Sequence, residues 1–402
     1  MATLFNPFSP EFRADPYPLY ARLREATAAT GTPFGSVIVT RYEPVDRILR
    51  SSGFRTPRGF RDPDDPGGPA RYDPDGVLSR HRRHWILFQS GEAHARLRRL
   101  ITKVFTPRAV RELAPRIEAM VDSLLAPALE RGSMEVIADL AYPLPSTVIC
   151  ELLGIPESDR DLNRGWAAAA AATLDPVTTD AQVALAERAM IEWDAYIRAF
   201  LAERRARPGD ALIDAMLAVE DDGTSLSEDE VAANATFLFA AGHETTTNLV
   251  GNGLLALLRH PDQLALLRRE PAAVENGIEE LLRFDSPVQF AARVALASTE
   301  IEGHPVEPGI VVMLALGAAN RDPRRYQRPD DLDVRRPDIK PLSFGGGPHY
   351  CVGAALARLE GRIAFTRLLA RARSIELATD RPAWRTTLNL RALERLDVTL
   401  SP

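Results

Sequence analysis

The stretch Phe344-Gly-Gly-Gly-Pro-His-Tyr-Cys351-Val-Gly353 says more about this chain than any other. It places one cysteine in a glycine-rich loop, directly before a run of helical character. A thiolate held in this way offers one soft anionic ligand to a metal. The chain has only two cysteines, so a zinc cage built from several thiolates is excluded. Ligation of a haem iron by a single sulfur stays open.

The composition is that of a globular protein. The chain has 402 residues, of which 45% are hydrophobic and 26% charged, so it can bury a large core. A formal net charge of −6 argues against nucleic acid as a partner. Two cysteines cannot form a disulfide framework, and we expect a cytoplasmic protein. We expect neither a signal peptide nor a membrane partner, since the stretch from Met1 to Pro18 carries prolines and charges and no long uncharged apolar run follows.

The pattern predicts a single domain over residues 1–402, mostly α-helical with small β-sheets. Leu and Ala recur at helical spacing in a helical core over about residues 92–290. Short β-branched runs at 35–40 and 299–314 predict strands. Alternating βαβ units are not evident, which argues against a doubly wound fold. Pro, Gly and Asp crowd the stretch 55–74, which is typical of a functional or mobile loop.

One predicted helix is unusually long. Ser227-Glu-Asp-Glu230 has the form of a capping box, and the apolar pattern then continues to His260. About 30 residues would make this helix roughly 45–50 Å long. A final helix is predicted from Ala354 to about Arg373.

The middle of the long helix has poor helix formers. Gly242 and three threonines follow the apolar run that starts at Phe237, with Glu244 between them. Threonine can bond the carbonyl one turn back and loosen the helix. A polar face turned to solvent is the alternative, but the apolar run argues against it. Residues that depart from helix propensity in this way favour a functional site.

The chain resembles the cytochrome P450 family, in its bacterial soluble form, in four motifs that fall in the family's order. The loop 344–353 matches the family's cysteine signature, Phe-Gly-x-Gly-x-His-x-Cys-x-Gly. The other three are the oxygen-activation motif at 241–246, the Glu-x-x-Arg pair at 280–283 and the His-x-x-x-Arg segment at 94–98. Together with Asp15-Pro-Tyr-Pro18, the resemblance covers essentially the whole chain.

The resemblance implies that haem b is the cofactor, with Cys351 as the axial ligand of its iron. The other interpretation of Cys351, a buried inert thiol, suits Cys150 better, because Cys150 lies in an apolar run. The haem carboxylates need cations, and the resemblance assigns these to His94, Arg98, Arg293 and His349. It also places Ala241, Gly242, Phe344 and Gly353 at the haem.

The reaction implied by the resemblance inserts one oxygen atom from O2 into a small apolar organic substrate, by hydroxylation or epoxidation, in secondary metabolism or catabolism. Glu244 and Thr245 would handle the protons. The chain has no reductase segment, so electrons would come from a separate ferredoxin and its NAD(P)H-dependent reductase. We expect a monomer. Two alternatives are a non-catalytic haem-fold binding protein, which would be expected to lose Cys351 or the Glu244–Thr245 pair, and a gas sensor, which would need an output domain.

Basic residues at two places have more than one interpretation. Arg98 lies in a basic helix surface with Arg96, Arg99 and Lys103, so the alternative to its role at the haem is a solvated face, and both interpretations can hold together. The remaining basic residues there would suit a docking patch for an acidic electron-transfer protein. The run from Arg80 to His84 predicts a solvated loop, or else a receiver of an anionic substrate or carrier protein.

The resemblance also assigns structural and pocket residues. Glu280 and Arg283 would form a structural ion pair. The family adds a third arginine, but Asp331 stands at its place, so Arg328 or Arg335 is expected to substitute. The substrate pocket would draw on mainly apolar residues: Leu87, Phe88, Phe237, Ala240, Ala241, Val288, Gln289, Phe290 and Leu388.

Overall fold

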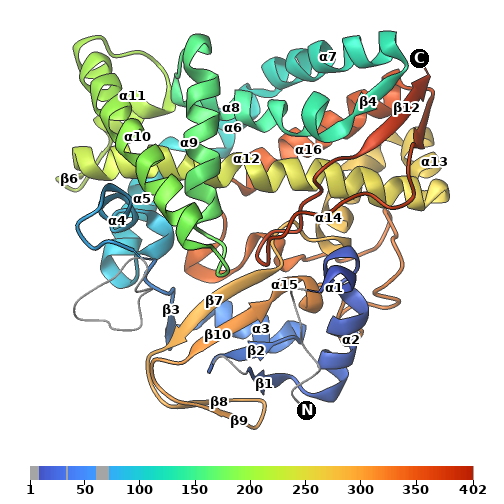
Figure 1. Ribbon diagram of the computed structural model, residues 1–402, viewed down its shortest axis with the longest axis horizontal. Coiled ribbons are helices and arrows are strands. Elements are labelled where there is room, and N and C mark those ends of the chain that lie inside the picture. The colour runs from blue at the N-terminus through green and yellow to red at the C-terminus, as the bar shows by residue number, and fades with distance from the viewer. Residues whose placement is uncertain (1–8, 33–34, 60–71, 402) are drawn as a thin grey trace. The chain divides into compact units, whose positions relative to one another are not determined.

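The computed structural model describes residues 9–32, 35–59 and 72–401, so most of the predicted loop at 55–74 lies outside the described residues (Figure 1). The chain divides into two compact units. The first contains Met1–Arg55, Leu113–Pro145 and Glu244–Pro402, and the second contains Thr56–Glu112 and Ser146–His243. Two helices, α8 (Pro143–Leu153) and α12 (Glu228–Arg259), contain boundaries between the units.

The first unit holds most of the strands. Its helices are α1 (Pro10–Ala14), α2 (Tyr17–Ala26), α3 (Tyr42–Arg50), α7 (Ala114–Arg131), α13 (Pro261–Arg269), α14 (Val274–Phe284), α15 (Leu316–Ala319) and α16 (Ala354–Arg371). Its strands are β1 (Ala29–Gly31), β2 (Val37–Val39), β3 (Phe54–Arg55), β4 (Ser133–Glu135), β7 (Phe290–Ala295), β8 (Thr299–Ile301), β9 (His304–Val306), β10 (Val311–Ala315), β11 (Ser374–Leu377) and β12 (Asp397–Ser401). Short turns of other helix types are η2 (Ile137–Ala141), η4 (Pro271–Ala273), η5 (Leu342–Phe344) and η6 (Gly347–His349).

The largest sheet has the strand order β1-β2-β10-β7-β3. Strands β2 and β10 run parallel, with Val37 opposite Val312 and Val39 opposite Leu314, and the other neighbours are antiparallel. The β-branched residues of β2 are all buried, as suits a strand covered on both faces. A second sheet has the order β11-β12-β4, and β8 and β9 form a hairpin.

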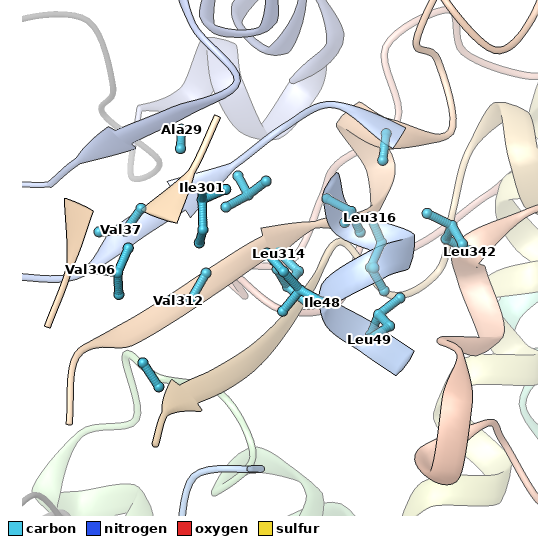
Figure 2. Close-up of a cluster of buried hydrophobic side chains, with 14 residues drawn as sticks. Ala29, Val37, Ile48, Leu49, Ile301, Val306, Val312, Leu314, Leu316 and Leu342 are labelled. Carbon is cyan, nitrogen blue, oxygen red and sulfur yellow. The ribbon is translucent and has the colours of Figure 1, made fainter. Parts of the chain in front are cut away.

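A hydrophobic cluster joins the large sheet to α3 and to the start of the cysteine loop. Figure 2 shows Val37, Val312 and Leu314 on the strands, with Ile48 and Leu49 on α3. The cluster continues to Leu342, two residues before Phe344. Burial of such side chains stabilises the fold by about 1.5–3 kcal/mol each. The loop that carries Cys351 therefore starts from a well-packed core.

The second unit is mostly helical. Its helices are α4 (Val77–Arg82), α5 (Gly91–Val104), α6 (Pro107–Glu112), α9 (Arg160–Ala172), α10 (Asp180–Ala206) and α11 (Leu212–Ala218), with short turns η1 (Ile86–Phe88) and η3 (Glu157–Asp159). One hairpin, β5 (Glu220–Asp221) with β6 (Thr224–Ser225), interrupts the helices. Its turn residues, Asp222 and Gly223, both have positive φ, which is the two-residue hairpin turn that an Asp-Gly pair favours.

The predicted long helix is confirmed as α12, with 32 residues from Glu228 to Arg259. Its capping box is present, because Glu230 N donates to Ser227 Oγ (3.2 Å) and Ser227 N donates to Glu230 Oε2 (2.9 Å). The helix stays continuous through Gly242 and the threonines. The final helix is confirmed as α16, ending two residues earlier than predicted.

The mostly helical fold with small sheets is also confirmed. The hairpin β5–β6 and the strand β4 were not expected within the helical stretch. Strand β4 pairs with β12 near the end of the chain, so only a partner more than 250 residues away defines it.

Helix α16 buries a carboxylic acid. Glu360 is 2% exposed, and Oε2 has no hydrogen-bond partner among the described residues. Desolvation by burial raises the pKa of Glu360 from 4.5 to about 8. The group is therefore protonated in the folded protein near neutral pH, where the same group in the unfolded chain is ionised.

This predicts that the stability of the protein falls as the pH rises from about 4.5 to about 8, by up to about 1.4 kcal/mol per pH unit from Glu360 alone. The stability falls because, in this range, the folded state retains a proton that the unfolded state has lost, so a rise in pH favours the unfolded state. In Glu360→Gln this contribution is absent, so the melting temperature of the variant minus that of the wild type should increase with pH over this window. The exposed Glu376→Gln is the control. A difference that does not change with pH would show that Glu360 is ionised in the fold.

Candidate active site

The cysteine loop is closed by its own backbone. Cys351 N donates to Phe344 O (3.0 Å), and the turn between them needs positive φ at Gly345 and Gly347. A side chain at Gly347 would also collide with α3, since its Cβ would lie 2.5 Å from Leu49 O. These two glycines are thus required by geometry. The loop presents Cys351 as an exposed side chain, whereas Cys150 is fully buried.

Cys351 also lies three residues before the first residue of α16. The amino end of a helix carries a partial positive charge, which favours the thiolate form of a nearby cysteine. Phe344, at the other end of the loop, is covered by Arg358, whose guanidinium carbon lies 4.4 Å from the ring centre. Arg358 is fixed in turn by a double hydrogen bond with Glu279. The loop is therefore held at both ends.

Arg293 on β7 is a buried cation that has no acidic partner among the described residues. It is 6% exposed, and its Nη1 donates to the neighbouring Ala292 O (2.9 Å). In the part of the chain that the structure describes, no carboxylate forms an ion pair with it. Desolvation lowers the pKa of Arg293 to about 10. A bound group that carries a carboxylate would supply the missing charge, and this fits a haem with its carboxylate side chains. An exposed thiol and a buried guanidinium in one unit are thus consistent with the predicted cofactor.

The acid–alcohol pair of α12 also lies in the first unit. Glu244 Oε1 lies 3.4 Å from Arg385 Nη1, and the carboxylate side chain is 18% exposed. Arg385 is anchored by its backbone, since its N donates to Ala392 O (2.9 Å). Thr245 follows directly and is half-buried. The C-terminal segment therefore fixes the position of the acid on α12.

The remaining predicted haem residues divide between the units. His349 lies in the cysteine loop of the first unit, whereas His94 and Arg98 lie one turn apart on α5 of the second. His94 is 4% exposed and Arg98 is half-buried. Ala241 and Gly242 also belong to the second unit. That these residues serve one haem stays a prediction.

The predicted pocket residues have different environments. In the second unit Leu87, Phe88 and Phe237 are half-buried and Ala240 is buried. In the first unit Val288 is half-buried, whereas Phe290 and Leu388 are buried.

Gln289, the one polar residue among the predicted pocket residues, already has partners. Its Nε2 donates to Ser286 O (2.7 Å), and its Oε1 accepts from the hydroxyl of Tyr20 (2.9 Å). The structure thus gives Gln289 a structural role, and its contact with substrate stays a prediction.

Glu280 and Arg283 form the expected ion pair, and both are fully buried. The third arginine is Arg336, whose Nε lies 3.2 Å from both carboxylate oxygens of Glu280. The expectation of Arg328 or Arg335 was wrong. Arg335 pairs with Glu270, and Arg328 pairs with Asp331, both at the surface. The reason is a turn in which Arg336 N donates to Asp333 O, so that Arg335 stands at the corner and Arg336 returns to the interior.

The ion network reaches the cysteine loop through Asn320. Arg283 Nη1 donates to Asn320 O (3.0 Å), and Asn320 Oδ1 accepts from Leu342 N (2.7 Å). Asn320 Nδ2 also donates to Ser343 Oγ (3.0 Å). Asn320 therefore connects the buried charges to the two residues that precede Phe344.

The basic residues of α5 and of the run from Arg80 to His84 are only partly solvated, in contrast to the interpretation as fully solvated segments. On α5, Arg96 pairs with Glu230, and Arg99 and Lys103 share Asp221. In the run Arg80 to His84, Arg80 is exposed as expected for a solvated segment. His81 and Arg82 are each only 3% exposed, so the solvated interpretation was wrong for these two.

Sequence reasoning missed two arginines that contact predicted site residues, Arg336 and Arg385, and also missed the buried acid Glu360. Nothing in their local sequence distinguishes the three from surface charges, because the partners of Arg336 and Arg385 and the elements that bury Glu360 come from elsewhere in the chain. Only the folded structure brings Arg385 to Glu244 and Arg336 to Glu280.

No helix among the described residues combines the length and the apolar character that crossing a membrane requires.

Comparison with known proteins identifies the family to which the chain is similar. The family model described as Cytochrome P450 matches residues 174–382. A curated relative, Vitamin D(3) 25-hydroxylase of Pseudonocardia autotrophica, is 39% identical over 98% of this chain and 96% of its own length.

Two solved structures are similar throughout. The crystal structure of P450BioI in complex with hexadec-9Z-enoic acid ligated acyl carrier protein has a TM-score of 0.91 and 36% identity, covering 97% of this chain and 99% of that one. The myxobacterial cytochrome P450 CYP267B1 in complex with myristic acid has a TM-score of 0.89 and 34% identity, covering 98% and 99%.

The Glu280 network predicts unequal effects of two neighbouring arginines. Arg336→Met leaves a buried carboxylate with one guanidinium instead of two, and we expect a loss of about 3 kcal/mol in the free energy of unfolding. Arg335→Met removes only a surface pair, and its effect should stay within about 1 kcal/mol. Denaturant unfolding of both variants measures the difference. Equal losses would mean that Arg336 is not the third member of the network.

Proposed function

This chain belongs to the cytochrome P450 family and uses haem b as its cofactor, and from that premise we propose that Cys351 is the thiolate ligand of the haem iron. The protein is a monooxygenase that inserts one oxygen atom from O2 into an organic substrate. The observation that carries the assignment is the exposed Cys351 side chain, held by a closed glycine loop in front of α16. Haem, when bound, supplies the chemistry of O2 activation.

We assign the binding of the haem carboxylates to Arg293, with His349, His94 and Arg98 as further donors. Arg293 is supported best, because it is buried and has no acidic partner among the described side chains. A planar guanidinium suits a carboxylate, which can accept two parallel hydrogen bonds from it. Phe344, Gly353, Ala241 and Gly242 complete the proposed contacts to the cofactor.

Glu244 and Thr245 carry the proton transfers in this proposal. The carboxylate of Glu244 is 18% exposed, so it can exchange protons with solvent, and Arg385 holds it in place. The hydroxyl of Thr245 can accept a proton from one side and donate one to the other. An acid that reaches solvent, next to a half-buried alcohol, is the arrangement that a proton relay requires.

Electrons come from a separate ferredoxin and its NAD(P)H-dependent reductase in this proposal. The basic face of α5 supports docking of an acidic partner only weakly, because Asp221 offsets one of the two exposed cations, Arg99 and Lys103. A net charge of about one unit remains there, and such charges act mainly on the rate of association. A monomeric state and a cytoplasmic location stay predictions.

The substrate proposed here is a small organic molecule with a mainly apolar body. The pocket residues Leu87, Phe88 and Phe237 in the second unit support this, since all three are apolar and half-buried. A related structure was solved with myristic acid, which has such a body. A non-catalytic haem-binding role is not favoured, since Cys351, Glu244 and Thr245 are all present and a full-length relative is a hydroxylase.

Replacement of Cys351 tests the thiolate ligand. The reduced, carbon-monoxide-bound wild type should show the red-shifted Soret band of a thiolate-ligated haem, and Cys351→Ser should lose it because the sulfur is gone. Cys150→Ala, at the only other cysteine, should keep the band. A wild-type spectrum typical of histidine ligation would contradict the assignment.

Replacement of Thr245 tests the proton relay. In Thr245→Ala the hydroxyl is lost, so consumption of NAD(P)H should continue while product per NAD(P)H falls by about tenfold or more. Thr247→Ala, two residues along the same helix, is the control and should keep the wild-type ratio. The measurement compares NAD(P)H oxidation with product formation in a reconstituted system. Unchanged coupling in Thr245→Ala would remove Thr245 from the relay.

A further inference from the structure

Helix α4 packs against α10 (Figure 1). Two carboxylates of α10 fix it there and so determine where its last residue, Arg82, lies. Glu187 accepts hydrogen bonds from Val77 N (2.5 Å) and Leu78 N (3.2 Å) at the amino end of α4. Asp194 lies 2.7 Å from His81 Nε2, one turn further along. Asp194 also binds Arg198. Both acids are therefore already engaged, and neither pairs with Arg82.

Arg82 is buried, at 3% exposure, among aromatic rings. Its guanidinium carbon lies 4.4 Å from the ring centre of Tyr72, 4.9 Å from that of Phe88 and 5.6 Å from that of Trp85. Nη1 donates to Thr173 Oγ1 (2.7 Å) and Thr173 O (3.2 Å). Nε has no hydrogen-bond partner among the described residues. At least one donor of this side chain, Nε, is thus not used by the residues that the structure describes.

The charge of Arg82 is compensated only in part. Thr173 follows the last residue of α9, and the carboxyl end of a helix provides about half a negative charge. Within the described residues no carboxylate lies at ion-pair distance, and burial lowers the pKa of Arg82. A buried guanidinium without a counter-ion is costly, and the missing partner is an anion.

Trp85 provides a second, independent indication that a hydrogen-bond acceptor is missing at this place. It is 0% exposed, and its indole Nε1 has no hydrogen-bond acceptor among the described residues. Trp85 stacks on Phe88, with ring centres 5.8 Å apart, and its ring centre lies 5.3 Å from that of Phe237. Two buried donors, for which the described part of the chain supplies no acceptor, thus belong to one aromatic cluster, together with two of the proposed pocket residues.

Two purely structural explanations leave part of these observations on Arg82 and Trp85 unexplained. As a cap on α9, Arg82 uses Nη1 alone, and a neutral donor would serve equally well there. A buried water molecule would satisfy the donors but leave the charge without a counter-ion. An anion with two acceptor oxygens would satisfy the donors and also compensate the charge. The forked geometry of a guanidinium matches a carboxylate in particular.

We propose that Arg82 determines substrate specificity by binding the carboxylate of an otherwise apolar small molecule, with the indole N–H of Trp85 as a further donor. This rests on the proposed function and specifies its substrate class. Burial selects a small molecule over an acidic protein surface, because a surface carboxylate of a folded partner could not reach a side chain that is 3% exposed. Arg80, which is exposed on the same helix, would be the residue for a macromolecular partner.

The test uses the haem-loaded protein and pairs of ligands that share a tail and differ only in carboxylate or hydroxyl: tetradecanoic acid and 1-tetradecanol, citronellic acid and citronellol, 4-phenylbutyric acid and 4-phenylbutanol. Binding is followed by the change in the haem absorption spectrum. In the wild type the best-binding acid should bind about tenfold or more tightly than its alcohol, as for a charge-assisted hydrogen bond. In Arg82→Gln that preference should disappear, with the affinity for the alcohol unchanged within about threefold.

Arg80→Gln is the matched control, since it removes the same charge from the same helix at an exposed position, and it should keep the wild-type preference. Arg82→Lys keeps the charge but not the fork, and should show an intermediate preference. In the wild type alone, the preference should also weaken as the pH falls below about 4.3 and the ligand carboxylate is protonated.

Several results would overturn the proposal. One is that no acid binds the wild type more tightly than its alcohol. Another is that Arg82→Gln weakens acid and alcohol equally, which would show a purely structural role. A third is that the preference is lost in Arg80→Gln instead, which would point to an exposed basic surface. The reduced carbon-monoxide spectrum of each variant separates these outcomes from failure of the haem–thiolate assignment, because a protein that keeps the red-shifted band has an intact haem site whatever ligand it prefers.

Discussion

The carboxylate of Glu280 is the constraint on which the first unit depends most. It is fully buried and faces two guanidinium groups, those of Arg283 and Arg336, so that its charge is more than matched. The remaining donors of the two arginines hold backbone carbonyls of Asn320, Pro329 and Asp331, among others. One buried charge thus fixes a segment that has no regular secondary structure. Because Asn320 also binds Leu342 and Ser343, the same network fixes the residues from which the cysteine loop begins.

Two other buried arginines differ from this pattern in a way that relates to function. Arg293 and Arg82 are as well buried as Arg336, but no described carboxylate pairs with either. A charge that is structural is normally matched within the protein, because an unmatched charge costs several kcal/mol. A charge that binds a ligand is matched only when the ligand is present. The difference between matched and unmatched arginines therefore separates the frame of this protein from its proposed binding groups.

Several elements could be predicted from local sequence. Helix α12 could be predicted in this way, because its capping box and its apolar period lie within one continuous stretch of the chain. The cysteine loop could be as well, since Gly345 and Gly347 have positive φ and one of them also touches α3. The sheet of β11, β12 and β4 could not, because β4 is three residues long and is defined by a partner more than 250 residues away. The same holds for Arg335 and Arg336, whose local sequence is equivalent and whose roles are assigned by a single turn.

By itself, the sequence determined the family, and it identified the residues proposed as the haem ligand and as the acid–alcohol pair, because each is encoded in a short run of neighbouring residues. The tertiary structure decided which charges are buried and which are matched. It brought Arg385 to Glu244, Arg336 to Glu280 and Thr173 to Arg82. The physical reason is that burial and electrostatic compensation are properties of an environment, and residues distant in the chain create that environment only when it folds.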